Sequence, residues 1–262
     1  MRFGIAGCAG RMGKLLMAEV LEKGHEIAAG TVSSRSGLAG TDLGDILGPK
    51  RIGSLATDDP KKLFEADVVI DFSTAGATAL HAELAALKGK PIVIGTTGLD
   101  VAAERAVLAA SQVVPVLRAS NFSRGVALLE MLVAEAAAKL GREADIEIFE
   151  MHHRNKPDSP SGTALTLGRA AAMARGQDLD VVGVTSRPDR RVPEGIGFAS
   201  LRGGTVIGDH TVILALDGER VELGHKADNR NIYAKGAVSA ALWLLKQPPG
   251  LYGMREYTAA QG

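Results

Sequence analysis

The sequence predicts an α/β protein with a Rossmann-like, doubly wound parallel sheet and a second α+β domain that contains an open mixed sheet. Three observations support this fold class. A strand, a glycine loop and a helix open the chain, and strand-helix units repeat to about residue 122. Short alternating runs separated by glycines follow. Glycine is abundant, at 32 residues, whereas aromatic residues make up 4%, which favours tight strand-to-helix turns over an aromatic-rich β-sandwich.

The first domain is predicted from apolar runs that alternate with amphipathic segments. Runs such as 67–72 are apolar throughout, as in strands of a parallel sheet that is covered on both faces. The segment 37–57 is glycine-rich and irregular, and no role is assigned to it. We expect strands at 2–6, 26–32, 67–72, 91–95 and 113–117, and helices at 14–23, 75–88 and 101–110.

The second domain is predicted to start where the pattern changes. A closing helix at 232–246, with Trp243 on its apolar face, returns to complete the first domain. The boundaries are therefore 1–123 with 231–262 for the dinucleotide-binding domain, and 124–230 for the substrate-binding and oligomerisation domain. We expect helices at 126–140 and 163–174 and strands at 145–149, 181–185, 197–201, 204–207, 210–216 and 220–224.

Composition excludes several classes of function. Lys plus Arg equals Asp plus Glu at 30 each, so nothing indicates a nucleic-acid partner. The N-terminus enters an apolar strand without a signal-peptide pattern, and no apolar run reaches the roughly 18 residues of a membrane span. A single cysteine, Cys8, excludes an internal disulfide and a cysteine-based structural zinc site. We therefore expect a cytoplasmic protein without a membrane segment.

The glycine loop after the first strand is a candidate dinucleotide site. Gly7, Gly10 and Gly13 let the backbone turn sharply, approach a pyrophosphate and pack the helix on the sheet. The spacing is Gly-x-x-Gly-x-x-Gly, and the alternative is a tight turn with no ligand. In a doubly wound sheet, ligands bind beyond the carboxyl ends of the strands, where Ser73, Thr96 and Thr97 also fall.

The residues after the second strand bear on the choice of cofactor. An Asp or Glu at this place would accept hydrogen bonds from the ribose 2′-OH of NAD. Ser33, Ser34 and Arg35 stand there instead. The missing carboxylate and the added cation favour the 2′-phosphate of NADPH, although the three residues are also compatible with a solvated loop.

The polar loop between the strand at 145–149 and the helix at 163–174 is the main candidate for chemistry. His152 and His153 titrate near neutral pH, and Lys156 adds a positive charge. Gly162 and Thr163 would open the helix with backbone N–H groups that attract anions. This set suits a carboxylate substrate that exchanges a proton, whereas the alternative is a surface loop with a serine cap and two solvated histidines.

Several blocks of sequence occur together in one known family. The pattern Glu-x-His-His-x-x-Lys-x-Asp-x-Pro-Ser-Gly-Thr-Ala fills 150–164, and further blocks lie at 7–13, 71–73, 95–98, 120–123, 197–199, 202–204 and 225–237. In these blocks the chain resembles the 4-hydroxy-tetrahydrodipicolinate reductases, long called dihydrodipicolinate reductases, of bacterial diaminopimelate and lysine synthesis. The resemblance covers nearly the whole chain.

The resemblance implies a reaction and a set of site residues. A nicotinamide between the Gly95 loop and the His152 loop would pass hydride to a cyclic dicarboxylate, with loss of the 4-hydroxyl as water. His152 would be the proton donor or acceptor and Lys156 the second proton donor, and which of them delivers the proton in the hydride step stays open. The substrate would be held by His153, Thr97, Gly162, Thr163 and Arg230. NADPH or NADH would be bound through Gly7, Cys8, Ala9, Gly10, Arg11, Met12, Gly95, Thr96, Thr97, Ala119, Ser120, Asn121 and Phe122.

The resemblance also implies a homotetramer built largely by the sheet of the second domain, with no metal ion. One departure from the family pattern concerns the cofactor, because Ser33 or Ser34 replaces a common acidic residue. That replacement puts efficient use of NADH in question.

Two rival functions remain at this stage. A semialdehyde dehydrogenase that acts through a thiohemiacetal would need a thiolate near the substrate domain, but Cys8 lies in the phosphate loop. A non-catalytic dinucleotide sensor that kept the fold would be expected to have lost His152 and Lys156, yet both are present.

Overall fold

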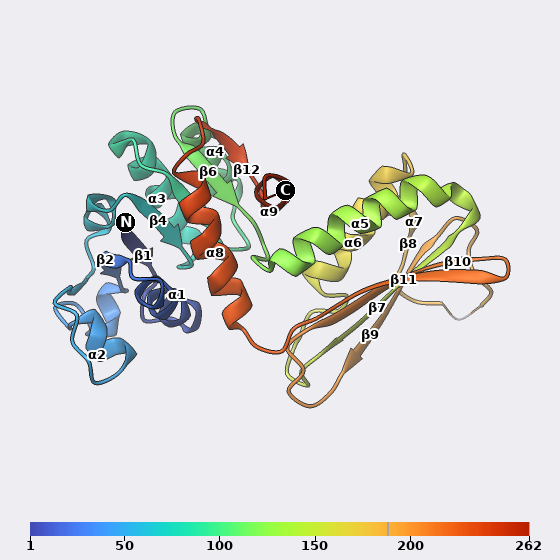
Figure 1. The fold of residues 1–262 in the computed structure, drawn as a ribbon, viewed down its shortest axis with the longest axis horizontal. Coiled ribbons are helices and arrows are strands. Elements are labelled where there is room, and N and C mark those ends of the chain that lie inside the picture. The colour runs from blue at the N-terminus through green and yellow to red at the C-terminus, as the bar shows by residue number, and fades with distance from the viewer. Residues whose placement is uncertain (188, 262) are drawn as a thin grey trace. The chain divides into compact units, whose positions relative to one another are not determined.

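The computed structural model describes residues 1–187 and 189–261. The chain divides into two compact units (Figure 1). One comprises Met1–Phe122 and the segment that starts at Asn231, and the other comprises Ser123–Arg230. The predicted fold class is confirmed, because one unit holds a parallel sheet flanked by helices and the other a mixed sheet.

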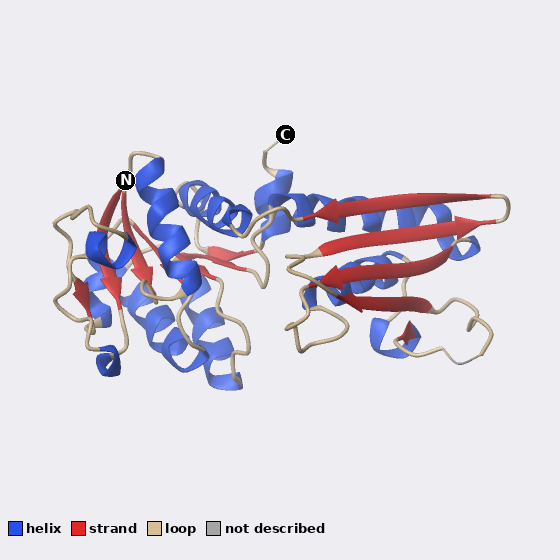
Figure 2. Cartoon of the chain, turned by 90° about the horizontal axis from the view of Figure 1, so that it is seen from below, coloured by secondary structure: helices blue, strands red, loops and turns tan. Residues whose placement is uncertain are grey.

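The first unit is built on a seven-stranded sheet in the order β12-β6-β5-β4-β1-β2-β3, with parallel neighbours throughout. Helix α1 packs against α8, and α3 packs against α4, and Figure 2 shows helices on both sides of these strands. The strands are β1 (Arg2–Ala6), β2 (Glu26–Thr31), β3 (Ala56–Thr57), β4 (Val68–Asp71), β5 (Ile92–Ile94), β6 (Pro115–Arg118) and β12 (Gly250–Tyr252). The helices are α1 (Arg11–Glu22), α2 (Leu43–Leu47), α3 (Ala75–Lys88), α4 (Val101–Ser111), α8 (Asn231–Leu244) and α9 (Met254–Ala259), with 3-10 turns η1 (Ser34–Ser36) and η2 (Pro60–Glu65).

The second unit packs two long helices against a five-stranded sheet in the order β11-β10-β7-β9-β8. Strand β10 runs antiparallel to β11 and to β7, whereas β7, β9 and β8 are parallel. The strands are β7 (Asp145–His152), β8 (Gly183–Val184), β9 (Ile196–Arg202), β10 (Asp209–Leu216) and β11 (Glu219–Lys226). The helices are α5 (Arg124–Leu140), α6 (Gly162–Ala174) and α7 (Leu179–Val182), with a 3-10 turn η3 at Gly141–Glu143.

Strict alternation along β7 and β10 decides which side chains face the two long helices. Ile146, Ile148, Val212 and Leu214 are buried in the core with residues of α5 and α6. Polar residues continue the same inward phase toward one end of the sheet, because Glu150 pairs with His210 in the strand register. The helix-facing side of this sheet therefore changes from apolar to polar along its length.

The structure corrects three details of the predicted strands. The parallel sheet has seven strands and not five, because β3 and β12 are too short to give a pattern. The expected strand at 204–207 is a turn and loop, since Gly204 adopts a left-handed φ of 50° that interrupts an extended chain. The expected strand at 181–185 is only partly extended: Val181 and Val182 end helix α7, which Asp178 caps by accepting from the Asp180 N–H, and Gly183–Val184 form the short strand β8.

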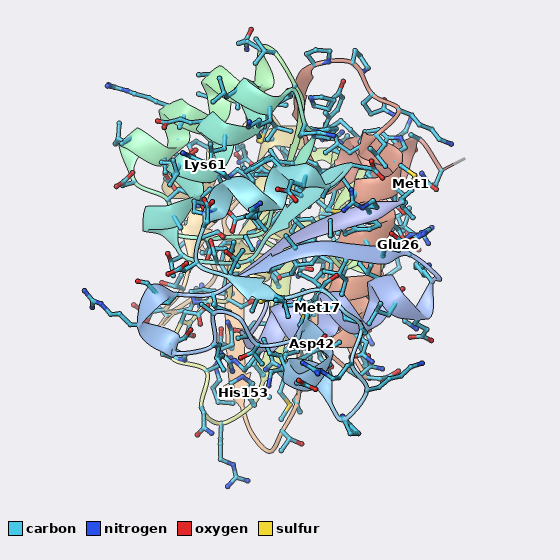
Figure 3. The ribbon with its side chains drawn as sticks, turned by 90° about the vertical axis from the view of Figure 1, so that its left-hand side faces the viewer. Met1, Met17, Glu26, Asp42, Lys61 and His153 are labelled. Atoms are coloured by element: carbon cyan, nitrogen blue, oxygen red, sulfur yellow. The ribbon has the colours of Figure 1, made fainter. Side chains whose placement is uncertain are left out.

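The segment 37–57 folds around a buried carboxylate. Asp42, labelled in Figure 3, caps α2 by accepting from the N–H of Gly44, and it also accepts from Ile52 and Gly53. Trp243 of α8 is half-buried and packs edge-on against Tyr252. Among the described residues, no helix combines the length and apolar character that crossing a bilayer requires.

Candidate active site

The loop after β1 turns directly onto α1. Gly7 adopts a φ of 75°, and a Cβ built at Gly13 would lie 2.2 Å from the Gly7 carbonyl oxygen, so a larger residue at Gly13 would clash. Gly10 is the N-cap and brings no side chain to the first backbone N–H groups of the helix. Those groups are the kind of donor that binds phosphate at a helix N-terminus.

A pocket of about 420 Å³ lies at the carboxyl ends of the parallel strands. Its walls come from the loops after β1, β4 and β5. The ring of Phe72 lies over Gly95, where a Cβ would come within 2.2 Å of it. The pocket brings together six residues that the sequence assigns to the cofactor, and it adds four others. The lining is Gly10, Arg11, Met12, Phe72, Ser73, Thr74, Ala75, Gly95, Thr96 and Thr97.

Asp71 lies under this pocket with no exposed surface. Its carboxylate accepts from the hydroxyl of Ser73 at 2.5 Å, from Thr78 at 2.9 Å, from Nδ1 of His81 at 3.0 Å and from Thr96 at 3.3 Å. Burial opposes ionisation, but the His81 and Ser73 contacts lower the pKa of Asp71 on balance. Because Ser73 and Thr96 line the pocket, Asp71 fixes two of its walls.

Other residues that the sequence assigns to the cofactor lie outside the lining. Ser33, Ser34 and Arg35 are exposed after β2, where Ser33 accepts from the Arg35 N–H at 3.3 Å. Phe122 is buried and packs against Phe72 with ring centroids 5.3 Å apart and the ring planes tilted by 53°. Gly7, Cys8, Ala9, Ala119, Ser120 and Asn121 also fall outside the lining.

Cys8 is fully buried, and burial raises the pKa of its thiol to about 11. A protonated, enclosed thiol is a poor nucleophile. This environment argues against the thiohemiacetal rival. The start of α1, which has no side-chain cap, instead fits a bound dinucleotide, and so does the close approach of Gly7 to Gly13. Both features leave backbone N–H groups open to a pyrophosphate.

In the second unit, Glu150 and His152 form a buried pair at the end of β7, with 1% and 8% of their surfaces exposed. Burial opposes ionisation of Glu150, but hydrogen bonds from Arg202, Ser200 and His152 lower its pKa on balance, so it is a carboxylate. A carboxylate only accepts, so Nδ1 of His152 must donate to Glu150. The other ring nitrogen, Nε2, faces Gly208, where a built Cβ would lie 2.9 Å from it.

The charge state of His152 reflects opposing influences. Burial, the largest of them, lowers the pKa of the imidazole, whereas Glu150 raises it, and the positive charges of Lys156 and Arg202 lower it further. The net direction is downward. Near neutral pH the ring is therefore neutral and carries a lone pair on Nε2.

Lys156 lies in the loop after β7, with 20% of its side chain exposed. Its Nζ donates to both carboxylate oxygens of Asp158 at 2.8 Å, and this contact lowers the pKa of Asp158. The backbone N–H of Lys156 donates to the carbonyl of His153 at 3.1 Å. The ammonium is thus paired but remains in contact with solvent.

Helix α6 begins beside the Glu150 pair. Ser161 caps the helix by accepting from the Ala164 N–H at 3.2 Å, and its own N–H donates to Glu150 at 3.3 Å. The Ser161 hydroxyl also contacts Nε2 of His210 at 3.1 Å. His210 is 3% exposed, and burial lowers the pKa of its imidazole to about 4.

The remaining predicted substrate residues occupy several places. Gly162 and Thr163 form the first turn of α6, and His153 follows β7 and is half-buried. Arg230 is exposed at the end of the second unit, and Thr97 is exposed in the pocket of the first unit.

Sequence reasoning gave no role to Glu150, Arg202, His210 or Asp71. A signal for two of them existed, because Glu150 and His210 occupy the inward phase of alternating strands, where polar residues need partners. Within the described ranges, no group of three or more His, Cys, Asp or Glu side chains is arranged to hold a metal ion.

Two family models together match nearly the whole chain. The model described as dihydrodipicolinate reductase, N-terminus, matches residues 1–122, and the model described as dihydrodipicolinate reductase, C-terminus, matches residues 125–257. The first covers the Rossmann-like part with the glycine loop and the pocket.

Similar whole-length relatives have the same description. A 4-hydroxy-tetrahydrodipicolinate reductase of Magnetococcus marinus is 47% identical over 98% of this chain and 97% of its own length. One from Halorhodospira halophila is 46% identical over 97% of each. A solved structure, dipicolinate-bound dihydrodipicolinate reductase from Paenisporosarcina sp. TG-14, has a TM-score of 0.79 at 24% identity and covers 98% of both chains.

Proposed function

The chain belongs to the dihydrodipicolinate reductase family, and on that premise we propose that it reduces 4-hydroxy-tetrahydrodipicolinate to tetrahydrodipicolinate with loss of water, in the diaminopimelate route of lysine synthesis. It is an oxidoreductase with a pyridine-nucleotide-binding Rossmann domain. The observation that carries the proposal has two parts: Glu150 contacts both His152 and the N–H of Ser161 at the start of α6, and the charge of Lys156 acts on His152. The chain that holds them matches these reductases over 98% of its length.

The reaction adds one hydride and one proton to the ring system and releases the 4-hydroxyl as water. When bound, reduced nicotinamide supplies the hydride. The protein then has to bind a doubly negative ring, provide protons and stabilise the charge that develops on the ring.

Carboxylate binding is assigned to the start of α6 and its surroundings. Gly162 and Thr163 present backbone N–H groups at a helix N-terminus, which favours anions. His153 and Arg230, from the same unit, complete the proposed set, and the guanidinium of Arg230 is suited to a two-point contact with a carboxylate. Thr97, in the first unit, stays a substrate residue predicted from the sequence. The dipicolinate in the Paenisporosarcina structure is also a small cyclic dicarboxylate.

Proton transfer is assigned to His152 and Lys156. The neutral imidazole holds a lone pair on Nε2, and a dianionic substrate nearby would favour its protonated form. Lys156 supplies a fixed cation once its contact with Asp158 is exchanged for substrate. In this proposal His152 carries the proton reversibly, and Lys156 stabilises the developing charge.

We propose NADPH as the preferred cofactor, with NADH as the alternative. Ser33, Ser34 and Arg35 are exposed at the end of β2 and offer hydroxyl groups and a cation to a 2′-phosphate. A cytoplasmic location and a homotetramer belong to the proposal as predictions from the sequence.

The direct test supplies the cyclised condensation product of pyruvate and aspartate semialdehyde with each reduced cofactor in turn. We expect nicotinamide absorbance to fall at a rate that depends on both reactants, faster with NADPH. Unchanged absorbance with both cofactors, from protein that binds NADPH, would reject the proposed reaction.

A further inference from the structure

Glu150 is positioned to do more than contact one histidine. We propose that Glu150, held by Arg202, is a positioning residue that locks the imidazole of His152 to the start of α6 and to the loop that carries Lys156. This inference rests on the proposed function, because it explains how the groups assigned to proton transfer and carboxylate binding keep a fixed geometry.

The contacts of the carboxylate supply the first step. Both of its oxygens are used twice: Oε2 accepts from Nδ1 of His152 and from Nη1 of Arg202 at 3.0 Å, and Oε1 accepts from Nη2 of Arg202 at 2.9 Å and from the Ser161 N–H at 3.3 Å. Together with the side chain of Ser200, these donors leave the buried carboxylate little freedom to turn. The ring of His152 and the first residue before α6 are thus fixed by one side chain.

The guanidinium of Arg202 extends the connection to the catalytic loop. Besides its two-point contact with Glu150, it donates to the carbonyl of Lys156 at 3.4 Å and to the carbonyl of Asp158 at 2.5 Å. These carbonyls belong to Lys156 itself and to Asp158, its ion-pair partner, in the loop that follows the turn at 154–155. Loss of Arg202 would therefore release the loop and leave Glu150 with an uncompensated charge.

The orientation of His152 follows from the same contacts. Glu150 takes the Nδ1 proton, which leaves Nε2 as the nitrogen that can exchange a proton, on the side facing Gly208. A histidine without this partner could adopt the other tautomer or rotate. The carboxylate therefore selects which nitrogen reacts.

The charges around His152 make the proposal testable. Glu150 on β7 is the negative group, and the positive groups are Arg202 on β9 and Lys156 in the loop, while His210 on β10 packs edge-on with ring centroids 5.1 Å apart. Removing the carboxylate should make protonation of His152 harder. Removing the guanidinium should make it easier, because a repulsive charge is lost and Glu150 is no longer neutralised.

The experiment is a pH titration of 15N-labelled histidine by NMR in the full-length protein, with the His152 signals among the six histidines assigned by their loss in His152→Gln. We expect wild-type His152 to be the Nδ1–H tautomer when neutral. Glu150→Gln should lower the pKa of His152 by about 1 pH unit, and Arg202→Gln should raise it by about the same amount. The double variant should fall between the two.

Glu147→Gln is the matched control, because it removes a carboxylate from the same strand. Glu147 pairs with Arg187 and Arg191, away from the Glu150 cluster. We expect this control to leave the tautomer and the pKa of His152 unchanged. If Glu150→Gln does not fold, the pKa of His152 in Arg202→Gln is the test. If Arg202→Gln does not fold, Arg202→Lys replaces it, and this variant should free the loop without a large rise in the pKa of His152.

Shifts in the same direction for both single variants, or no shift in folded protein, would overturn the proposal. So would an Nε2–H tautomer in the wild type. The titration needs no turnover, so it separates this inference from the proposed reaction. Opposite shifts in the pKa of His152, in a protein without reductase activity, would support the positioning role of Glu150 and reject the proposed function. In an active enzyme, both variants should lower kcat more than they raise KM.

Discussion

A buried carboxylate lies at the functional end of each unit, and the two are stabilised in different ways. Asp71, beneath the pocket of the first unit, is surrounded mainly by hydroxyl groups and by the imidazole of His81. Glu150, in the second unit, faces the guanidinium of Arg202 and the imidazole of His152. Both carboxylates have a lowered pKa despite burial.

The different partners indicate different roles for the two carboxylates. Asp71 accepts from Ser73 and Thr96, which line the pocket, so this carboxylate fixes the shape of the pocket. The partners of Glu150 include the imidazole of His152, whose second nitrogen faces Gly208, so that carboxylate acts on a residue that we propose transfers protons. Changes in the second unit should therefore act on turnover, and changes in the first on cofactor binding.

The largest effect is expected at Lys156. Lys156→Ala should lower kcat by roughly 10²–10⁴-fold, because a positioned acid–base group contributes about that much, with little change in NADPH affinity. Steady-state rates and a fluorescence titration measure the two quantities. Lys139→Ala, at the end of α5, is the control, and near-normal turnover of Lys156→Ala would remove Lys156 from catalysis.

The space in front of His152 is the next place to test. Gly208→Ala should lower kcat by roughly tenfold to a hundredfold, since its Cβ would lie 2.9 Å from Nε2 and displace either ring or substrate. A Cβ at Gly203, in the same loop, would meet only the end of the Met151 side chain, at 3.0 Å, so Gly203→Ala should leave kcat nearly unchanged. Equal rates for the two variants would show that Nε2 is not the reacting nitrogen.

Cofactor choice tests the first unit. Ser33→Glu should shift the ratio of kcat/KM for NADPH over NADH by about tenfold toward NADH, because a carboxylate repels the 2′-phosphate and accepts from a 2′-OH. Ser36→Glu places the same charge three residues further along and should change the ratio less. An unaltered ratio in Ser33→Glu would place the phosphate site elsewhere.

The last prediction concerns the stability of the fold at acid pH, and we expect it to affect activity least. Burial lowers the pKa of His210 to about 4, so the unfolded chain binds a proton that the folded chain refuses between pH 6.5 and 4. The free energy of unfolding should fall as the pH drops through this window, by at most about 3 kcal/mol from this group.

Urea unfolding at several pH values measures this dependence. His210→Gln should flatten it. An equally steep fall in His210→Gln would assign the acid sensitivity to other groups.

Much of the fold was predictable because its signals are local. The helix at 75–88 was predicted with the observed bounds, since a threonine precedes it and a glycine in left-handed conformation ends it. Strands β3 and β12 were missed because two or three residues give no periodicity. Their extended conformation comes from pairing with a neighbour already in place.

The site was predictable only in part, for a similar reason. A motif identifies His152 and Lys156, whose spacing in the sequence is short. The partners that set their charge and orientation come from other strands: Arg202 lies 52 residues beyond Glu150, and His210 lies 49 beyond Ser161. Only the strand register, which the sequence does not state, brings them together.

The most direct test of the division between the two units compares Asp71→Asn with Glu150→Gln. The control is Asp100→Asn, because Asp100 caps α4 in the first unit by accepting from the Ala103 N–H. The measurement is kcat at saturating substrate together with the dissociation constant of NADPH. We expect Asp71→Asn to weaken NADPH binding by about tenfold with kcat nearly unchanged, and Glu150→Gln to lower kcat by about tenfold or more with NADPH binding nearly unchanged. The reverse pattern, or equal effects of both variants on both quantities, would contradict the account.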